Sequence, residues 1–125
     1  MPRRPLVSDR LPAPLAPYST AVLGSAEMWL SGQLGLVPGT AELAGPTATD
    51  QLTQIFANLD DILAEAGKDH GDVLRVTLYL ADMGDFDAVN GVYAEYFAAP
   101  YPARTAIAVA ALPMDARIEA DVVVG

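Results

Sequence analysis

An arginine and a glutamate near the C-terminus are the residues of this chain best suited to chemistry. Arg104 begins an apolar stretch two residues after Pro102, and Glu119 lies between Ile118 and Ala120. A guanidinium keeps its charge at any accessible pH, and its fork of donors can bind a planar carboxylate through two hydrogen bonds. We therefore interpret Arg104 as a binding group for a small carboxylic acid, in preference to one half of a structural salt bridge.

Glu119 allows two interpretations. Arg117 and Asp121 share its expected strand face, and charged residues in such alternation are typical of a solvated surface. If the same face instead forms a cleft between copies of the chain, partial burial raises the pKa of the Glu119 carboxyl, which can then pass protons through water. The sequence leaves both interpretations open.

Four further polar residues carry weaker signals. Ser31 lies outside the Gly-x-Ser-x-Gly nucleophile pattern, so we interpret its hydroxyl as a donor to a substrate. Tyr18 enters the first expected strand, where rim packing is the usual role. Asn90 lies on an expected helix, where packing or a cap-like bond is the default. The single histidine, His70, lies in a helix-to-strand loop, and we do not expect it to be catalytic.

Composition excludes several classes of function. The 125 residues suffice for one domain, residues 1–125, and the absence of cysteine removes disulfides and thiolate chemistry. One histidine cannot build the usual multi-histidine metal site, so no metal is predicted. A formal charge of -9 argues against a nucleic-acid partner, since phosphate contacts need clustered cations. No apolar run reaches the length of a membrane span or forms a signal-peptide core, and we expect a cytoplasmic protein.

The N-terminal half should form an arm, a hairpin and a helix. Residues 1–17 contain five prolines and are interpreted as an extended arm. Short β-prone runs at 18–23 and 27–31 flank a glycine-containing turn, which indicates a hairpin. Between about residues 47 and 66, apolar residues recur at three- and four-residue spacing, which predicts a one-sided helix ended by Gly67.

The C-terminal half should contain a strand, a helix and two more strands. Residues 72–80 alternate in a way that places Leu74, Val76, Leu78 and Leu80 on one apolar strand face. A second helix is expected from about 85 to 98, followed by strands near 104–111 and 116–124 with a turn at 112–115. This order predicts an α+β domain with both helices on one face of a mixed sheet. The uncovered face is then expected to meet other copies of the chain.

From Pro17 onward, the order and spacing of short motifs resemble the arginine-bearing branch of the Rid (YjgF-type) family of enamine/imine deaminases. The motifs are Pro17-Tyr18, Ser31-Gly32-Gln33, Gln51 through Asn58-Leu59, Ala66-Gly67, Val76-Thr77-Leu78-Tyr79-Leu80, Asp85-Phe86, Val89-Asn90 with Tyr93, Pro102-Ala103-Arg104-Thr105, Leu112-Pro113 and Ile118-Glu119. Each fragment is weak alone, and their combination is specific.

The resemblance implies a chorismate-mutase-like fold and a homotrimer with three clefts between subunits. It also implies hydrolysis of reactive 2-imino or enamine acids to 2-keto acids and ammonia, which needs no cofactor because the imine carbon is already electrophilic. Arg104 matches the family arginine that holds the substrate carboxylate. Glu119 matches the acid that positions or activates water. Tyr18, Ser31 and Asn90 match positions that line the cleft.

Two positions differ from the usual family pattern. Ala16 replaces a glycine, and Ala106 stands where many members have a cysteine, at a position expected to contribute its backbone N–H to substrate binding. The sequence therefore leaves open whether the protein removes reactive imines in general, as metabolite damage control, or serves one pathway. A non-catalytic trimer that binds a small acid is the alternative from another class, and Arg104 favours the enzyme.

Overall fold

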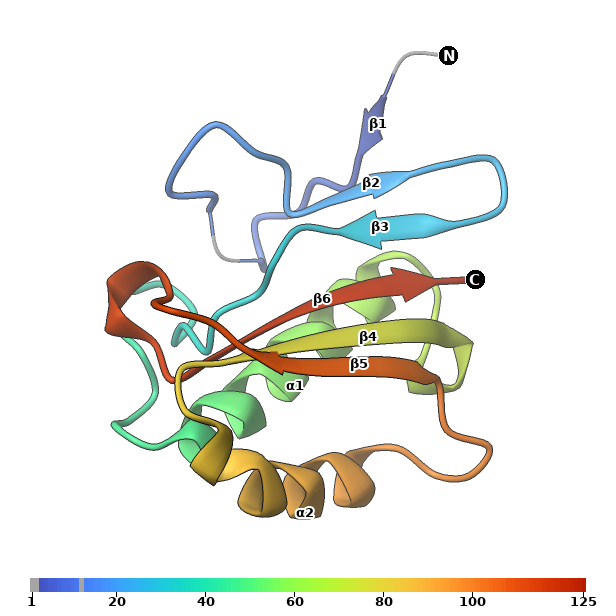
Figure 1. The fold of residues 1–125 in the computed structure, drawn as a ribbon. Helices are drawn as coiled ribbons and strands as arrows, with labels where there is room; N and C mark the ends of the chain where they lie inside the picture. The colour runs from blue at the N-terminus through green and yellow to red at the C-terminus, as the bar shows by residue number, and fades with distance from the viewer. Residues whose placement is uncertain (1–2, 12) are drawn as a thin grey trace.

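The fold is a six-stranded sheet that carries both helices on one face (Figure 1). The computed structural model describes residues 3–11 and 13–125. Along the chain the strands and α-helices are β1 (Arg4–Pro5), β2 (Ala21–Leu23), β3 (Met28–Leu30), α1 (Ala48–Glu65), β4 (Val73–Leu80), α2 (Phe86–Tyr96), β5 (Ala103–Ala108) and β6 (Ile118–Val124). Short 3-10 turns at His70–Asp72, Met83–Asp85 and Pro113–Asp115 precede β4, α2 and β6.

Helix α1 forms as its sequence predicts. The Thr47 side chain caps the first turn by accepting a hydrogen bond from the Asp50 backbone N–H. Gly67 follows the helix with a φ of 69°, a left-handed conformation that glycine adopts at little cost. The apolar face of α1 packs against the sheet, where Leu52, Ile55, Leu59, Ile62 and Leu63 are almost fully buried.

Strand β4 corrects one detail of the expected alternation. A β-bulge between Val73 and Arg75 shifts the register against β6. Val73 is therefore buried, whereas Leu74, expected on the apolar face, is 51% exposed. From Val76 onward the expected alternation holds, because the bulge has absorbed the extra residue.

The two C-terminal strands do not pair with each other. The sheet order is β1-β2-β3-β6-β4-β5, so β4 lies between them, antiparallel to β6 and parallel to β5. The expected turn at 112–115 is a 3-10 turn that carries the chain from one edge of β4 to the other side (Figure 1). Helix α2 ends at Tyr96, two residues before the predicted end, because Phe97 is already extended.

The predicted arm, residues 1–17, is tied to the body over much of its described length; residues 1–2 and 12 lie outside the described residues. Arg4 and Pro5 pair with Leu23 and Val22 as an edge strand. Leu11 is buried in the core that the helices share with the sheet, and the Arg10 guanidinium forms an ion pair with Glu65 on α1.

In the part of the chain that the structure describes, no helix covers the other face of the sheet, and large apolar side chains are exposed on its strands. Trp29 is 57% exposed and Ile107 is 42% exposed. Within the described residues, neither helix is long and apolar enough to cross a membrane.

Gln51 on α1 joins three segments of the fold, and we expect its loss to destabilise the protein. Its side chain is buried, donates to the Gly45 carbonyl (2.9 Å) and accepts from the Arg117 backbone N–H (2.8 Å). Gln51→Leu leaves both backbone groups without this partner, which should lower the free energy of unfolding by about 1–3 kcal/mol. Urea unfolding at one protein concentration measures this, with Ala57→Leu at an exposed position of the same helix as the control. An equal effect of both substitutions would contradict the role given to Gln51.

Candidate active site

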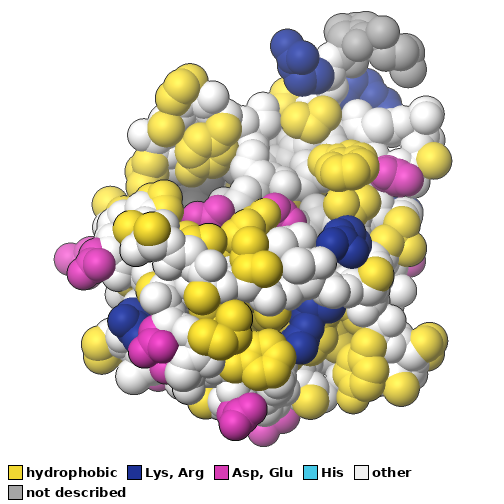
Figure 2. Space-filling view, viewed as in Figure 1, with side chains coloured by type: hydrophobic (Ala, Val, Ile, Leu, Met, Phe, Trp, Pro, Cys, Tyr) yellow, Lys and Arg dark blue, Asp and Glu magenta, His cyan; other side chains and the backbone are white. Residues whose placement is uncertain are grey.

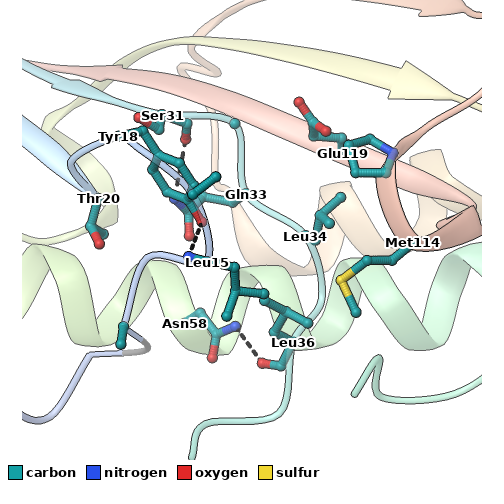
Figure 3. A pocket seen from close by; sticks show the side chains of 14 residues that line it. Leu15, Tyr18, Thr20, Ser31, Gln33, Leu34, Leu36, Asn58, Met114 and Glu119 are labelled. Atoms are coloured by element: carbon teal, nitrogen blue, oxygen red, sulfur yellow. Dashed lines mark hydrogen bonds between the residues drawn. The ribbon is translucent and has the colours of Figure 1, made fainter. Parts of the chain in front are cut away.

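A cavity of about 420 Å³ lies between the start of β6, the segment after β3 and the end of the N-terminal arm. Tyr18, Ser31 and Glu119, three of the predicted site residues, line it (Figure 3). Figure 2 shows a hollow on the corresponding side of the molecule, with hydrophobic side chains around its rim and acidic side chains beside it. The fold therefore brings these three residues to one concave surface.

Two hydrogen bonds orient the hydroxyl groups of the cavity wall (Figure 3). The Ser31 hydroxyl donates to the Ser19 carbonyl at 2.6 Å, so its lone pairs, rather than its proton, face other partners. The Tyr18 hydroxyl accepts from the Leu15 backbone N–H at 3.3 Å and keeps its own proton available as a donor. The expectation that Ser31 donates to a substrate thus applies only if this bond to Ser19 is exchanged.

The Glu119 carboxylate is held unusually close to the backbone of Gly32. A Cβ atom at position 32 would lie 2.2 Å from Glu119 Oε2, so only glycine leaves room for this side chain. Burial raises the pKa of the Glu119 carboxyl above its ordinary value, and the negative charge of Asp121 raises it further. Asp121 itself accepts a hydrogen bond from the Tyr79 hydroxyl at 2.7 Å. Glu119 is therefore a carboxyl with raised proton affinity at the wall of a cavity, as a general acid or base requires.

Arg104 lies in a second cluster, against α2. Its guanidinium donates to the Asn90 Oδ1 at 2.8 Å and lies 4.7 Å from the centre of the Tyr93 ring and 5.6 Å from that of Phe86. Phe86, Asn90 and Tyr93 follow one another at helical spacing, so one face of α2 presents all three to the arginine. In the described part of the chain no carboxylate lies within ion-pair distance of Arg104. The guanidinium is thus oriented, while its charge has no protein counter-ion.

Ala106 lies two residues further along β5. The Val109 N–H donates to Leu80 on β4, and successive backbone groups of a strand point to opposite sides. The Ala106 N–H therefore points away from β4, toward the outer edge of the sheet. Asn90, Arg104 and Ala106 form one group of predicted site residues at this edge.

The two groups lie on opposite faces of the sheet. Arg104 pairs across the strands with Val76, which is buried against the helices. Glu119 pairs with Tyr79, whose side chain alternates to the face without helices. A single chain therefore does not bring Arg104 and Glu119 to one small ligand.

Two other residues discussed from the sequence have structural partners. Arg117, expected beside Glu119, forms an ion pair with Asp85 at 3.0 Å. His70 packs against the rings of Tyr96 and Phe97. Within residues 3–11 and 13–125, no three His, Cys, Asp or Glu side chains cluster as ligands for a metal ion.

Several residues of these clusters were not predicted as site residues. Gly32 could have been found from its place directly after Ser31, and Tyr93 from its spacing three residues after Asn90. Met114 also lines the cavity. The Met114 backbone is left-handed, with φ 59°. A methionine rarely adopts this conformation, so the residue type gave no signal for it.

The mixed sheet, the helices on one face and the carboxylate-lined cavity define a small α+β protein of the Rid type. The family model described as Endoribonuclease L-PSP matches residues 8–125. The chain belongs to this family, which is the YjgF/Rid family expected from its motifs.

Named relatives and solved structures agree with this membership. The chain is 44% identical over 112 residues to Reactive Intermediate Deaminase A, chloroplastic, of Arabidopsis thaliana, of which it spans 60%. It is 39% identical to the human 2-iminobutanoate/2-iminopropanoate deaminase, over 97% of this chain and 88% of the relative. RidA from Psychrobacter sp. PAMC 21119 superposes with a TM-score of 0.92 at 36% identity, covering 98% of each chain. TdcF of E. coli, solved with bound serine, superposes with a TM-score of 0.87 at 30% identity, covering 97% of each chain. The predicted chorismate-mutase-like fold is confirmed.

We expect Glu119→Gln to stabilise the protein in a pH-dependent way. The pKa of Glu119 is raised by folding, so the folded state disfavours the ionised carboxyl. Below about pH 4 the carboxyl is protonated in both states and this penalty is absent. As the pH rises toward 7, the free energy of unfolding of Glu119→Gln should increase relative to that of the wild type.

Urea midpoints between pH 4 and 8, at one protein concentration, test this expectation. Glu95→Gln removes a carboxylate from the exposed surface of α2 and corrects for the change in net charge. A difference between Glu119→Gln and the wild type that stays constant with pH would mean that Glu119 is not a perturbed carboxyl.

Proposed function

We propose that this protein hydrolyses 2-imino acids, and the enamines that tautomerise to them, to 2-keto acids and ammonia. Curated relatives at about 40% identity over most of the chain are named for this chemistry, which supports the activity directly. The observation that carries the residue assignment is the Arg104 guanidinium, which Asn90 orients and which has no carboxylate partner among residues 3–11 and 13–125. Such a group is suited to bind the carboxylate that every 2-imino acid carries.

The reaction adds one water across the C=N bond. Water oxygen bonds to the imine carbon, its protons pass to nitrogen, and the carbinolamine then expels ammonia as the carbonyl forms. We assign to Glu119 the transfer of these protons, because its carboxyl lines the cavity and burial raises its pKa above the ordinary value. Tyr18 and Ser31 line the same cavity and would hold the imine beside the water. The Ala106 N–H, which points to the free edge of β5, is suited to bind a carboxylate oxygen next to Arg104.

In this proposal, association of several copies brings Arg104 and Glu119 close together. Because Arg104 and Glu119 lie on opposite faces of one sheet, a complete site needs Arg104 from one copy and Glu119 from the next. The helix-free face carries exposed Trp29 and Ile107, apolar groups that association would cover. A closed homotrimer, the assembly that the sequence resemblance implies, would form three equivalent sites of this kind.

Other activities fit less well. The family description names an endoribonuclease, but a formal charge of -9 repels a phosphate backbone. TdcF binds serine, a small acid, so a role limited to binding is the second candidate function. The proposal includes action in the cytoplasm, because a chain without cysteine does not need an oxidising compartment for disulfide formation.

Removing the Arg104 guanidinium should abolish most of the activity. A threonine dehydratase and threonine generate the imine, semicarbazide traps what remains free, and the rate of keto-acid formation is read against a reaction without protein. We expect Arg104→Ala to lower kcat/KM by about 100-fold, the loss of a charge-assisted bidentate contact. Arg104→Lys should also lose most activity, because an ammonium cannot form the fork.

Lys68→Ala removes an exposed cation elsewhere and serves as the control for net charge. Wild-type rates in Arg104→Ala would overturn the assignment of Arg104. Keto-acid binding by the wild type without turnover of any imine would favour the binding role.

Mixing two inactive variants tests whether sites form between copies. Arg104→Ala still supplies Glu119, and Glu119→Gln still supplies Arg104, so a site between one copy of each is intact. Random mixing in a trimer should restore about a quarter of wild-type sites, whereas each variant alone has none. Co-refolded mixtures, assayed beside unmixed variants, give the measurement. A mixture that stays inactive would contradict a site shared between copies.

A further inference from the structure

The cavity has a polar side and an apolar side. Ser31, Gln33 and Glu119 supply the polar side, and Leu15, Leu36 and Met114 lie on the apolar side (Figure 3). The cavity of the single chain, about 420 Å³, is within the range of about 300–1,000 Å³ that is usual for ligand pockets. The polar groups that the reaction needs do not account for this apolar side.

Met114 is held in the cavity wall by a strained turn. Met114 and Asp115 have φ values of 59° and 55°, a left-handed conformation that costs residues other than glycine about 1–3 kcal/mol each. Pro113 before them fixes its own φ, and the buried Ala116 after them donates its N–H back to the Pro113 carbonyl at 3.1 Å. The turn is thus anchored at both ends, which fixes the backbone position from which the Met114 side chain extends into the cavity.

The Met114 side chain points toward other apolar side chains of the cavity. Met114 extends toward Leu34 and Leu36 (Figure 3). The Asn58 side chain, buried on α1, donates to the Leu36 carbonyl at 2.8 Å and fixes that part of the wall. Leu15 is 56% exposed and lies on the arm, whose turn the Tyr18 hydroxyl holds. Leu15 and Met114 are exposed in this cavity and gain free energy when a ligand covers them, and the buried Leu36 forms part of the wall behind them.

We propose that Met114, with Leu15 and Leu36, binds the substrate side chain, so that this site selects 2-imino acids with long apolar side chains over short ones. The inference rests on the proposed function and assigns its substrate class. The 2-imino group, bound near Glu119, leaves the side chain of the acid to extend along the apolar wall. Each added methylene that the wall covers is worth about fourfold in kcat/KM.

Two imines made in the same way test the proposal. An amino-acid oxidase, with catalase, converts norleucine and alanine to 2-iminohexanoate and 2-iminopropanoate, and competition with semicarbazide gives kcat/KM for each. We expect the wild type to favour 2-iminohexanoate by about tenfold or more. Met114→Ala should lower this ratio about tenfold, because kcat/KM falls more on 2-iminohexanoate than on 2-iminopropanoate.

Matched variants separate apolar contact from backbone effects. Met114→Gln has similar length but a polar end and should also lower the ratio, whereas Met114→Leu should keep it. All three retain Cβ, so the strain of the turn is the same. Met83→Ala removes a methionine of equal exposure, 44%, outside the cavity and should change nothing.

The outcomes distinguish the two proposals. Equal kcat/KM on both imines in the wild type, or an unchanged ratio in Met114→Ala, overturns the role of Met114 and leaves the deaminase activity standing. A wild type that hydrolyses neither imine overturns the proposed function, and with it this inference.

Discussion

The alternation of side chains along β4 and its two neighbours is the constraint on which the rest of the site depends. β4 is the strand that β5 and β6 share, and its buried residues fix which side chains of each neighbour face the helices. Arg104 pairs with Val76 and therefore lies on the helix side of the sheet. Glu119 pairs with Tyr79 and therefore lies on the other side. A change of register by one residue would bury Glu119 in the core, so the pattern of β4 protects the chemistry as well as the fold.

The helices then act on the two charges in different ways. α2 gives Arg104 an amide oxygen and two aromatic faces, which hold the guanidinium without neutralising it. No helix covers Glu119, whose environment comes from Gly32 and Asp121. Neither charge is arranged for greatest stability, since a carboxylate beside Arg104 or a cation beside Glu119 would be the cheaper solution. Placement that costs stability is expected where a ligand or a second copy completes the interaction.

Local patterns in the sequence predicted the individual helices and strands better than they predicted how the strands pair with one another. The capping residues of α1 and the spacing of its apolar residues lie within one segment, and the helix forms where the sequence predicts it. The bulge after Val73 depends on how β4 meets β6, a contact between distant segments, so the exposure of Leu74 could not be predicted locally. Motifs likewise predicted Tyr18, Ser31, Arg104 and Glu119 as site residues, but only the sheet order shows that these four residues form two groups. Met114 was not predicted as a cavity residue, because its position depends on a left-handed backbone conformation that methionine does not favour.

The separation of the two groups has an electrostatic consequence for assembly. The chain carries a formal charge of -9, so copies repel one another at long range, and association must rely on short-range contacts. Among the described residues Arg104 has no carboxylate counter-ion, and Glu119 is a carboxylate beside another acid, so the proposed contact between copies would relieve both. A substrate carboxylate that binds Arg104 would instead meet the guanidinium first and leave Glu119 free to exchange protons. In the proposed assembly, the same pair of charges would favour association when the site is empty and chemistry when a small acid is bound, because Arg104 can satisfy only one anion fully at a time.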